Sequence, residues 1–169
     1  MQRACGLDCA IALAMIARNK SRLLLQKIAR DQDRAAKVAM KSKSEWMREA
    51  QAAVNRWVRL RDHDQPCISC GTTNPRQWHA GHYRTTKAAP ELRFNPNNIH
   101  KQCSQCNEYL SGNIPGYRPE LIRRIGLSSV EWLEGQHVPA RYTIEELREI
   151  KQGFAEWARE IENSLTYSE

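Results

Sequence analysis

Two cysteine pairs with the spacing Cys-x-x-Cys are the clearest chemical signal in this sequence. Cys67 and Cys70 form the first pair, and Cys103 and Cys106 form the second. Such a loop lets both thiolates point at one centre, and two loops complete the tetrahedral four-sulfur site that holds structural zinc. Four ordinary thiols or two disulfides are the alternatives. We expect a zinc ion here, which would hold together a segment too poor in apolar residues to pack by itself.

Histidine and asparagine residues around these pairs are the candidates for catalysis. His82 lies in a polar segment beside Tyr83, and its imidazole can take a proton from water near neutral pH. Asn98 precedes the second pair and Asn107 follows it directly. Their amide oxygens could help to hold a hard divalent cation or brace the loop that carries the base. Phosphodiester hydrolysis needs such a base, together with positive charge for the leaving oxygen.

Net charge and its distribution indicate a polyanionic partner. The chain carries 26 Lys and Arg against 19 Asp and Glu, for a net charge of +7. Residues 1–62 hold 14 basic and 6 acidic residues, whereas residues 118–169 hold 7 and 10. A basic half is typical of nucleic-acid binding, with a solvated helical face as the alternative. Four basic side chains near the cysteine pairs could bind phosphates or be plain surface charges: Arg84, Lys87, Arg93 and Lys101.

Helices must carry much of this charge. Residues 10–41 contain no Gly or Pro and repeat apolar residues at a helical period, which predicts one long basic helix. Such a helix could pair with a second copy of itself, lie along DNA, or do both. Ser44 is expected to cap a second helix that runs to about Arg61 and buries Trp46 and Trp57.

The segment with the cysteine pairs is expected to form a small zinc fold. A β-hairpin centred near residues 84–92 would separate the two cysteine loops. The second loop would open a short helix that ends near Leu110, at the sequence Ser-Gly-Asn.

The tail is also expected to be helical. Short helices are predicted near residues 119–125 and 128–134. Thr143 and Glu146 have the spacing of a capping box. The helix that they begin would run to about Glu162 and pack on the helix with the two tryptophans.

The order of His82, Asn98 and Asn107 around the cysteine pairs resembles the HNH nucleases, also called ββα-metal or His-Me finger nucleases. The resemblance implies that His82 is the general base, that Asn98 holds the loop in place, and that Asn107 binds the catalytic metal. It also implies a further metal ligand close to His79.

The position of that further ligand departs from the pattern. The family places it directly before the base, where Gly81 stands in this chain. A bulge could bring His79 into position, or another residue could be the ligand. His100 could be that substitute, bind phosphate, or lie on the surface, and the surface is what we expect.

A closer resemblance is to the phage NinG/Rap recombination proteins, over about residues 40–160. It rests on whole phrases: PCISCG at 66–71, AGHYRTT at 80–86, APELRFN at 89–95 and NIHKQC at 98–103. The resemblance implies a structure-specific endonuclease that acts on branched DNA such as D-loops and Holliday junctions, with structural zinc and catalytic Mg²⁺ or Mn²⁺. Family members tend to have an acidic residue where His79 stands. The alternative is therefore a zinc-stabilised protein that binds branched DNA without nuclease activity.

These expectations combine into a mainly α fold with a small zinc-bound, HNH-like ββα-metal core. A basic helical arm is expected at residues 1–43, a helix plus the nuclease core at 44–117, and a helical region that packs on the core at 118–169. The expected partners are branched DNA and a second copy of the chain. No membrane association is expected, because no apolar run approaches the roughly 20 residues that span a bilayer.

The remaining cysteines bear on location and assembly. No secretory signal is evident, and four of the six cysteines have metal spacing, which indicates a reducing cytoplasm. Given the resemblance, this is the cytoplasm of a phage-infected or prophage-bearing bacterium. Cys5 and Cys9 look like half of a zinc module, which two copies of the chain could complete, or they are idle thiols.

Overall fold

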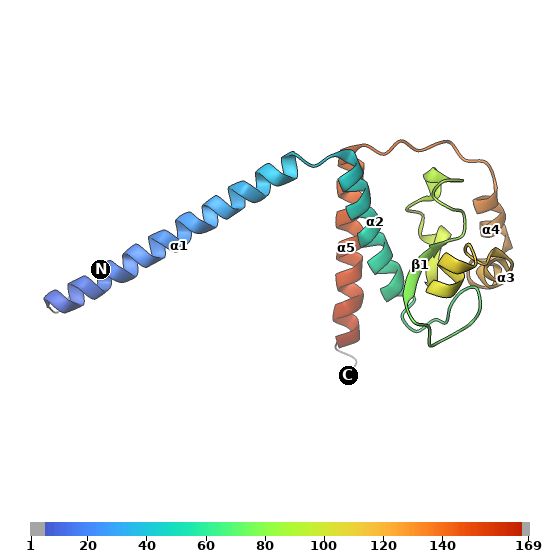
Figure 1. The fold of residues 1–169 in the computed structure, drawn as a ribbon, viewed down its shortest axis with the longest axis horizontal. Coiled ribbons are helices and arrows are strands. Elements are labelled where there is room, and N and C mark those ends of the chain that lie inside the picture. Colours follow the sequence, from blue (N-terminus) through green and yellow to red (C-terminus); the bar gives the residue numbers. More distant parts are fainter. Residues whose placement is uncertain (1–5, 167–169) are drawn as a thin grey trace. The chain divides into compact units, whose positions relative to one another are not determined.

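The computed structural model describes residues 6–166, and most of them are helical (Figure 1). This confirms the expected predominance of helix over strand. The chain divides into two compact units, one ending at Ser42 and the other beginning at Lys43. Both Cys-x-x-Cys pairs and the residues proposed for catalysis lie in the second unit.

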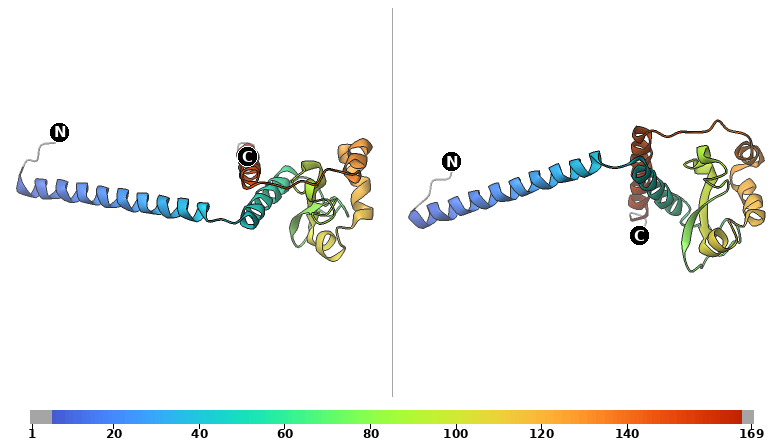
Figure 2. Two further views of the ribbon diagram at one scale, coloured as in Figure 1. Left: turned by 90° about the horizontal axis from the view of Figure 1, so that it is seen from above. Right: turned by 45° about the horizontal axis from the view of Figure 1, so that its top comes forward.

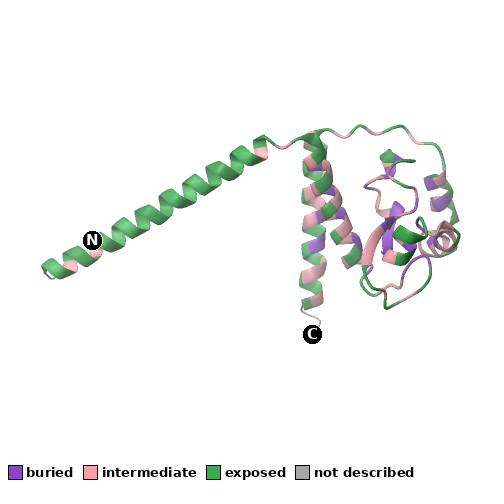
Figure 3. Cartoon of the chain, in the orientation of Figure 1, coloured by how far each residue is buried: buried purple, intermediate pink, exposed green. Residues whose placement is uncertain are grey.

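The first unit is one helix, α1 (Leu7–Ala39), which lies close to the range expected from the sequence. None of its residues is buried (Figure 3). At about 100° per residue, its Lys and Arg side chains all fall within about 200° of the circumference. The rest of the circumference carries mostly small or apolar residues such as Ala17, Leu24 and Ile28, together with Asp31 and Gln32. The helix is therefore amphipathic, and its apolar face is exposed. Cys5 lies outside the described residues.

Two long helices of the second unit, α2 (Lys43–Arg61) and α5 (Ile144–Thr166), pack side by side (Figure 1 and Figure 2). The ring of Trp57 lies 5.1 Å from the ring of Phe154 between centroids, and Val54 is fully buried. Each helix carries apolar residues at three- and four-residue spacings, which gives it one buried stripe. The predicted packing of the last helix on the second is confirmed.

The beginnings of these two helices test two sequence predictions. The capping box is present, because Glu146 N donates to Thr143 Oγ1 at 3.1 Å and Thr143 N donates to Glu146 Oε2 at 2.6 Å. The prediction that Ser44 caps α2 is wrong. α2 begins at Lys43, so Ser44 lies in its first turn and Ser42 immediately precedes the helix.

A two-stranded antiparallel sheet holds the centre of the second unit. β1 (Trp78–His82) pairs with β2 (Ile99–Cys103) in a continuous register from Trp78↔Cys103 to His82↔Ile99. The hairpin is therefore wider than predicted, and residues 84–92 belong to its connection rather than to its strands. This connection contains two short 3₁₀ turns, η1 (Pro90–Leu92) and η2 (Pro96–Asn98). Proline cannot donate a ladder hydrogen bond, so strand pairing cannot extend through these turns.

Three helices lie between the sheet and α5 in the chain: η3 (Gln105–Tyr109), which is a π-helix, α3 (Ile114–Ile125) and α4 (Leu127–Glu134). Ser111, Gly112 and Asn113 all have positive φ angles, which confirms the predicted stop after η3. α3 begins earlier than predicted because Pro115 stands in its first turn, where a helix needs no N–H donor.

A second core lies between the sheet, α3 and α4. Tyr117, Leu121, Val130 and Leu133 are completely buried there. The same core contains Ile68 from the first cysteine loop, and Tyr83 and Leu92 from the connection between the strands, so it joins α3 and α4 to these segments. Among residues 6–166, no helix is both long enough and apolar enough to cross a membrane.

Candidate functional site

The four cysteines of the two pairs converge on one point. Their Sγ atoms all lie within 4.8 Å of one another, and the sulfurs of Cys70 and Cys103 are 3.8 Å apart. Tetrahedral zinc with Zn–S bonds of about 2.3 Å requires sulfurs roughly 3.8 Å apart, so these positions fit the ion closely. The four thiols are free rather than paired in disulfides. The cluster can therefore hold a metal ion, as its spacing predicted.

Hydrogen bonds around the cluster favour thiolates. Cys103 N donates to the sulfur of Cys67 at 3.3 Å, and Cys106 N donates to the sulfur of Cys103 at 3.4 Å. Burial opposes ionisation of Cys67, but nearby backbone N–H groups bring its pKa below the usual value. Burial raises the pKa of Cys106 to about 12. A cation at the centre would offset this cost, because a coordinating thiol is deprotonated by its metal.

His82 is half-buried at the end of β1. Its Nε2 lies 3.0 Å from the carbonyl oxygen of Arg93. A carbonyl can only accept, so Nε2 carries the hydrogen and Nδ1 keeps its lone pair. Burial, together with the positive charge of Arg93, holds the pKa of His82 below its usual value despite this hydrogen bond. The side chain is therefore neutral near pH 7 and has one basic nitrogen, as a general base requires.

Asn98 holds the connection beside His82 in place. Its side chain is completely buried. Oδ1 accepts from Arg84 N at 2.8 Å, and Nδ2 donates to the carbonyl oxygens of Arg84 at 3.0 Å and Leu92 at 3.1 Å. The amide thus satisfies backbone groups at both ends of the connection, so it stabilises the loop rather than contacting the other proposed site residues.

His79 and Asn107 meet on the other side of β1. Asn107 Nδ2 lies 3.1 Å from His79 Nδ1. Glu108, which sequence reasoning missed, places Oε1 3.5 Å from the same nitrogen. Its signal was available, because a carboxylate directly after Asn107 extends the same ligand set. Divalent cations bind imidazole and carboxylate groups in proteins. The Asn107 amide turns its nitrogen toward His79 here and also carries an oxygen, which is the atom that could bind a cation.

The structure does not bring His82 into this group. His79 and His82 are three residues apart on a regular strand, so their side chains leave opposite faces. The bulge considered from the sequence is absent, because the register of β1 against β2 is continuous. Nor can the position directly before His82 hold a ligand. A Cβ atom on Gly81 would lie 2.0 Å from the buried amide oxygen of Gln102.

His100 is buried, so the expectation that it lies on the surface is wrong. Every residue of β2 is buried, and His100 Nδ1 lies 3.2 Å from the hydroxyl oxygen of Tyr117. That hydroxyl donates to the carbonyl oxygen of Gly81 at 3.0 Å. Burial lowers the pKa of His100 to about 3. The histidine therefore acts as a neutral structural link between α3 and the sheet.

Lys101 also differs from its expected exposed position. It is buried on β2, its Nζ donates to the carbonyl oxygen of His63 at 2.8 Å, and the same atom stands 4.3 Å from the centre of the Trp78 ring. Two further predicted phosphate contacts are engaged as well. Arg84 donates to the carbonyl oxygens of Leu133 and Glu134, and Arg93 donates to Gln51.

A cleft of about 460 Å³, here called the β1 cleft, opens beside His79 and Asn107. Its lining is Asn55 and Arg59 from α2, Gln77, Trp78, His79 and Ala80 from the β1 segment, and Asn107 from η3. The two residues from α2 were not predicted as site residues. Their only sequence signal was their spacing of four on one helix face.

Comparison with known proteins gives the family of the chain. The family described as "Bacteriophage Lambda NinG protein" matches residues 1–164. The chain belongs to the NinG family. Protein ninG of Escherichia phage lambda is 45% identical to it over 171 residues, which cover 95% of this chain and 84% of the relative. Protein ninG of Salmonella phage P22 is 43% identical over the same shares.

A third relative of this NinG-family chain matches over a shorter stretch. Protein ninG of Escherichia phage 933W is 50% identical over 135 residues, which cover 80% of this chain and 67% of the relative. No solved structure matches the chain significantly. The resemblance read from the sequence phrases is confirmed at the level of the NinG family.

Proposed function

We propose that this NinG-family protein is a structure-specific DNA endonuclease of phage recombination that cleaves branched DNA, such as D-loops and Holliday junctions. The observation that carries the proposal is His82, a neutral imidazole whose Nε2 is held by the Arg93 carbonyl at 3.0 Å. Nδ1 is left able to take a proton from an attacking water. Asn98 keeps the loop beside it rigid through three hydrogen bonds.

The order of β1, β2 and η3 around the cysteine cluster supports an HNH-like ββα-metal core. In this proposal the four cysteines hold zinc, whose role is structural. His79, Asn107 and Glu108 would hold a catalytic Mg²⁺ or Mn²⁺ ion. When bound, that ion supplies positive charge for the developing charge on the phosphate and the leaving oxygen.

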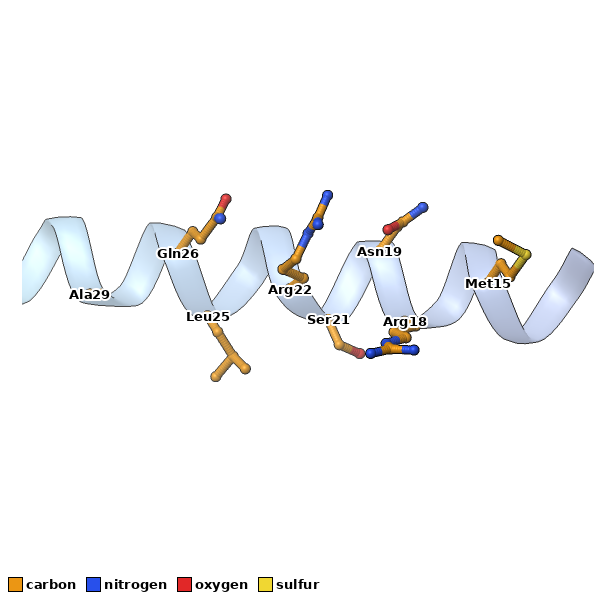
Figure 4. A pocket seen from close by; sticks show the side chains of 8 residues that line it. All are labelled: Met15, Arg18, Asn19, Ser21, Arg22, Leu25, Gln26 and Ala29. Atoms are coloured by element: carbon orange, nitrogen blue, oxygen red, sulfur yellow. The ribbon is translucent and has the colours of Figure 1, made fainter.

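The basic face of α1 is proposed to contact the DNA backbone. Figure 4 shows that the labelled side chains project to two sides of the helix: Met15, Asn19, Arg22 and Gln26 to one side, and Arg18, Ser21 and Leu25 to the other. These side chains stand on the outside of one helix and enclose no small-molecule site. The cationic and amide side chains lie between Arg18 and Lys37, along about 30 Å of the helix. This spacing suits a polyanion that runs alongside, because each phosphate contact releases counterions.

Cleavage of synthetic substrates tests the proposal. A four-way junction, a D-loop and a linear duplex would each be incubated with the wild type, His82→Ala and His63→Ala in Mg²⁺ or Mn²⁺. His63 is an exposed histidine and serves as the matched control. We expect the wild type and His63→Ala to cut the branched substrates in preference to the duplex. His82→Ala should bind them but not cut them. Equal cutting by wild type and His82→Ala would refute the role of His82.

A second candidate function is supported by one observation. His79 and His82 leave opposite faces of β1, and the position directly before His82 is closed by Gln102. This arrangement favours a zinc-stabilised protein that binds branched DNA without cutting it. The same assay separates the two functions. A wild type that binds junctions but leaves every substrate intact with either metal would establish the second and exclude the first.

A further inference from the structure

Arg59 is an exposed cation at the β1 cleft. It lies on α2 one turn after Asn55, and both residues line the cleft with His79 and Asn107. Residues four apart on a helix are neighbours on one face. The cleft thus has the proposed metal ligands on one wall and a guanidinium group with an amide on the other.

The two nearest arginines on α2 have acidic partners, whereas Arg59 has none among residues 6–166. Arg56 binds both carboxylate oxygens of Glu162, and Arg61 binds both oxygens of Asp62. Among residues 6–166, no ion pair or hydrogen bond engages the Arg59 side chain. Its five donors therefore remain available, and a planar guanidinium suits the two oxygens of a phosphate.

Asn55 is oriented so that its donor group is also available. Its Oδ1 accepts from Gln51 Nε2 at 2.9 Å. Gln51 Oε1 in turn accepts from Arg93 Nη1 at 3.3 Å, and the carbonyl oxygen of Arg93 is the partner of His82. The contact with Gln51 orients the Asn55 amide, with Oδ1 toward Gln51 and Nδ2 on the opposite side. Through Gln51 and Arg93, the cleft is also linked to the proposed base.

We propose that Arg59, together with the amide of Asn55, binds a phosphodiester of the DNA strand in the β1 cleft. The inference rests on the proposed function, because it places the phosphate beside His79 and Asn107. A phosphate carries a full negative charge, so acidic residues beside it would weaken its binding. The acidic residue of the proposed metal site is Glu108, and a bound cation would offset its charge. Arg59 would then position the strand, and its loss would weaken binding even where no cutting occurs.

Binding measurements with the full chain test this inference. Affinity for a four-way junction would be measured across a salt series, without added Mg²⁺ or Mn²⁺, for the wild type, Arg59→Ala, Arg59→Lys and Arg56→Ala. Arg56→Ala is the matched control, because it removes the same charge from the same helix but from a group already occupied by Glu162. The exposed position of Arg59 makes folding of its variants straightforward to verify by circular dichroism.

We expect Arg59→Ala to raise Kd about tenfold, as for the loss of one charge-assisted hydrogen-bonding group. It should reduce the slope of log K against log salt by about 1, which corresponds to one phosphate contact. Arg59→Lys should keep the slope and lose part of the affinity, because it keeps the charge but not the fork. Arg56→Ala should resemble the wild type.

Two outcomes would overturn the inference: wild-type affinity and salt slope in Arg59→Ala, or equal losses in Arg59→Ala and Arg56→Ala, which would indicate a general charge effect. Failure of the nuclease proposal looks different. A wild type that binds through Arg59 but cuts no substrate would exclude the nuclease and leave the phosphate site standing.

Discussion

Replacing Asn98 with alanine should destabilise the second unit strongly. The side chain is completely buried and makes three hydrogen bonds, two with Arg84 and one with Leu92. No other hydrogen bond is recorded for the Arg84 N–H in residues 6–166. Alanine would remove all three bonds at once and leave that donor without its acceptor in a confined space.

The magnitude follows from these contacts. Each bond contributes about 1 kcal/mol net, and a buried donor left unsatisfied costs about 1–3 kcal/mol more. The expected loss in the free energy of unfolding is therefore about 4–6 kcal/mol, with the lower end reached if a water enters the space. This is a large share of the roughly 5–15 kcal/mol that stabilises a typical domain.

Urea unfolding followed by tryptophan fluorescence would measure the loss. All five tryptophans lie in the second unit, so the signal reports that unit and not α1. At roughly 2 kcal/mol per M of urea, the midpoint should fall by about 2–3 M. Asn97→Ala is the matched control, because Asn97 is the exposed neighbour and its side chain makes none of these bonds. An Asn98→Ala midpoint equal to that of Asn97→Ala would refute the reasoning.

Three further predictions concern the metal, the base and α1. Cys67→Ser should release the bound metal and unfold the cysteine-rich core, whereas Cys9→Ser should change neither the metal content nor the fold. Elemental analysis would measure the metal and circular dichroism the fold. A folded wild type without metal would contradict the zinc site. Because burial lowers the pKa of His82, the base stays unprotonated to lower pH than a free imidazole. The acidic limb of kcat/KM should therefore lie below pH 6.5, which is the ordinary value for histidine, and a limb at or above it would count against His82. If the apolar face of α1 joins two copies, Leu24→Asp should convert a dimer to a monomer in light scattering; a monomeric wild type would exclude the dimer.

Several elements of the fold were predictable from the sequence because their signals are local. The helical period of α1, α2 and α5 and the capping box at Thr143 depend on residues within one or two turns of one another. The width of the hairpin was not predictable in this way. It depends on Asn98, whose side chain binds the backbone of Arg84 and Leu92, several residues away along the connection. No local sequence pattern predicts such contacts.

The candidate site also has a part that local sequence signals predicted and a part that they did not. The cysteine cluster was predictable because each Cys-x-x-Cys loop orients its two thiolates by itself. The burial of His100 and Lys101 was not predictable, because histidine and lysine side chains are usually exposed. Packing against α3 and α2 buries both residues in this structure. Glu108 became a candidate site residue only through its contact with His79, and Arg59 only because it lines the same cleft.

The sequence by itself determined the family, the long helices and the cluster of four cysteines that can hold a metal ion, because these follow from residue types at short, regular spacings. Only the tertiary structure decided which polar side chains share a cleft. It placed His79 beside Asn107 and brought Arg59 of α2 to the same cleft. It turned His82 to the other face of β1. The physical reason is that strand alternation and helix packing choose which residues meet across the chain, and spacing along one element cannot specify that choice.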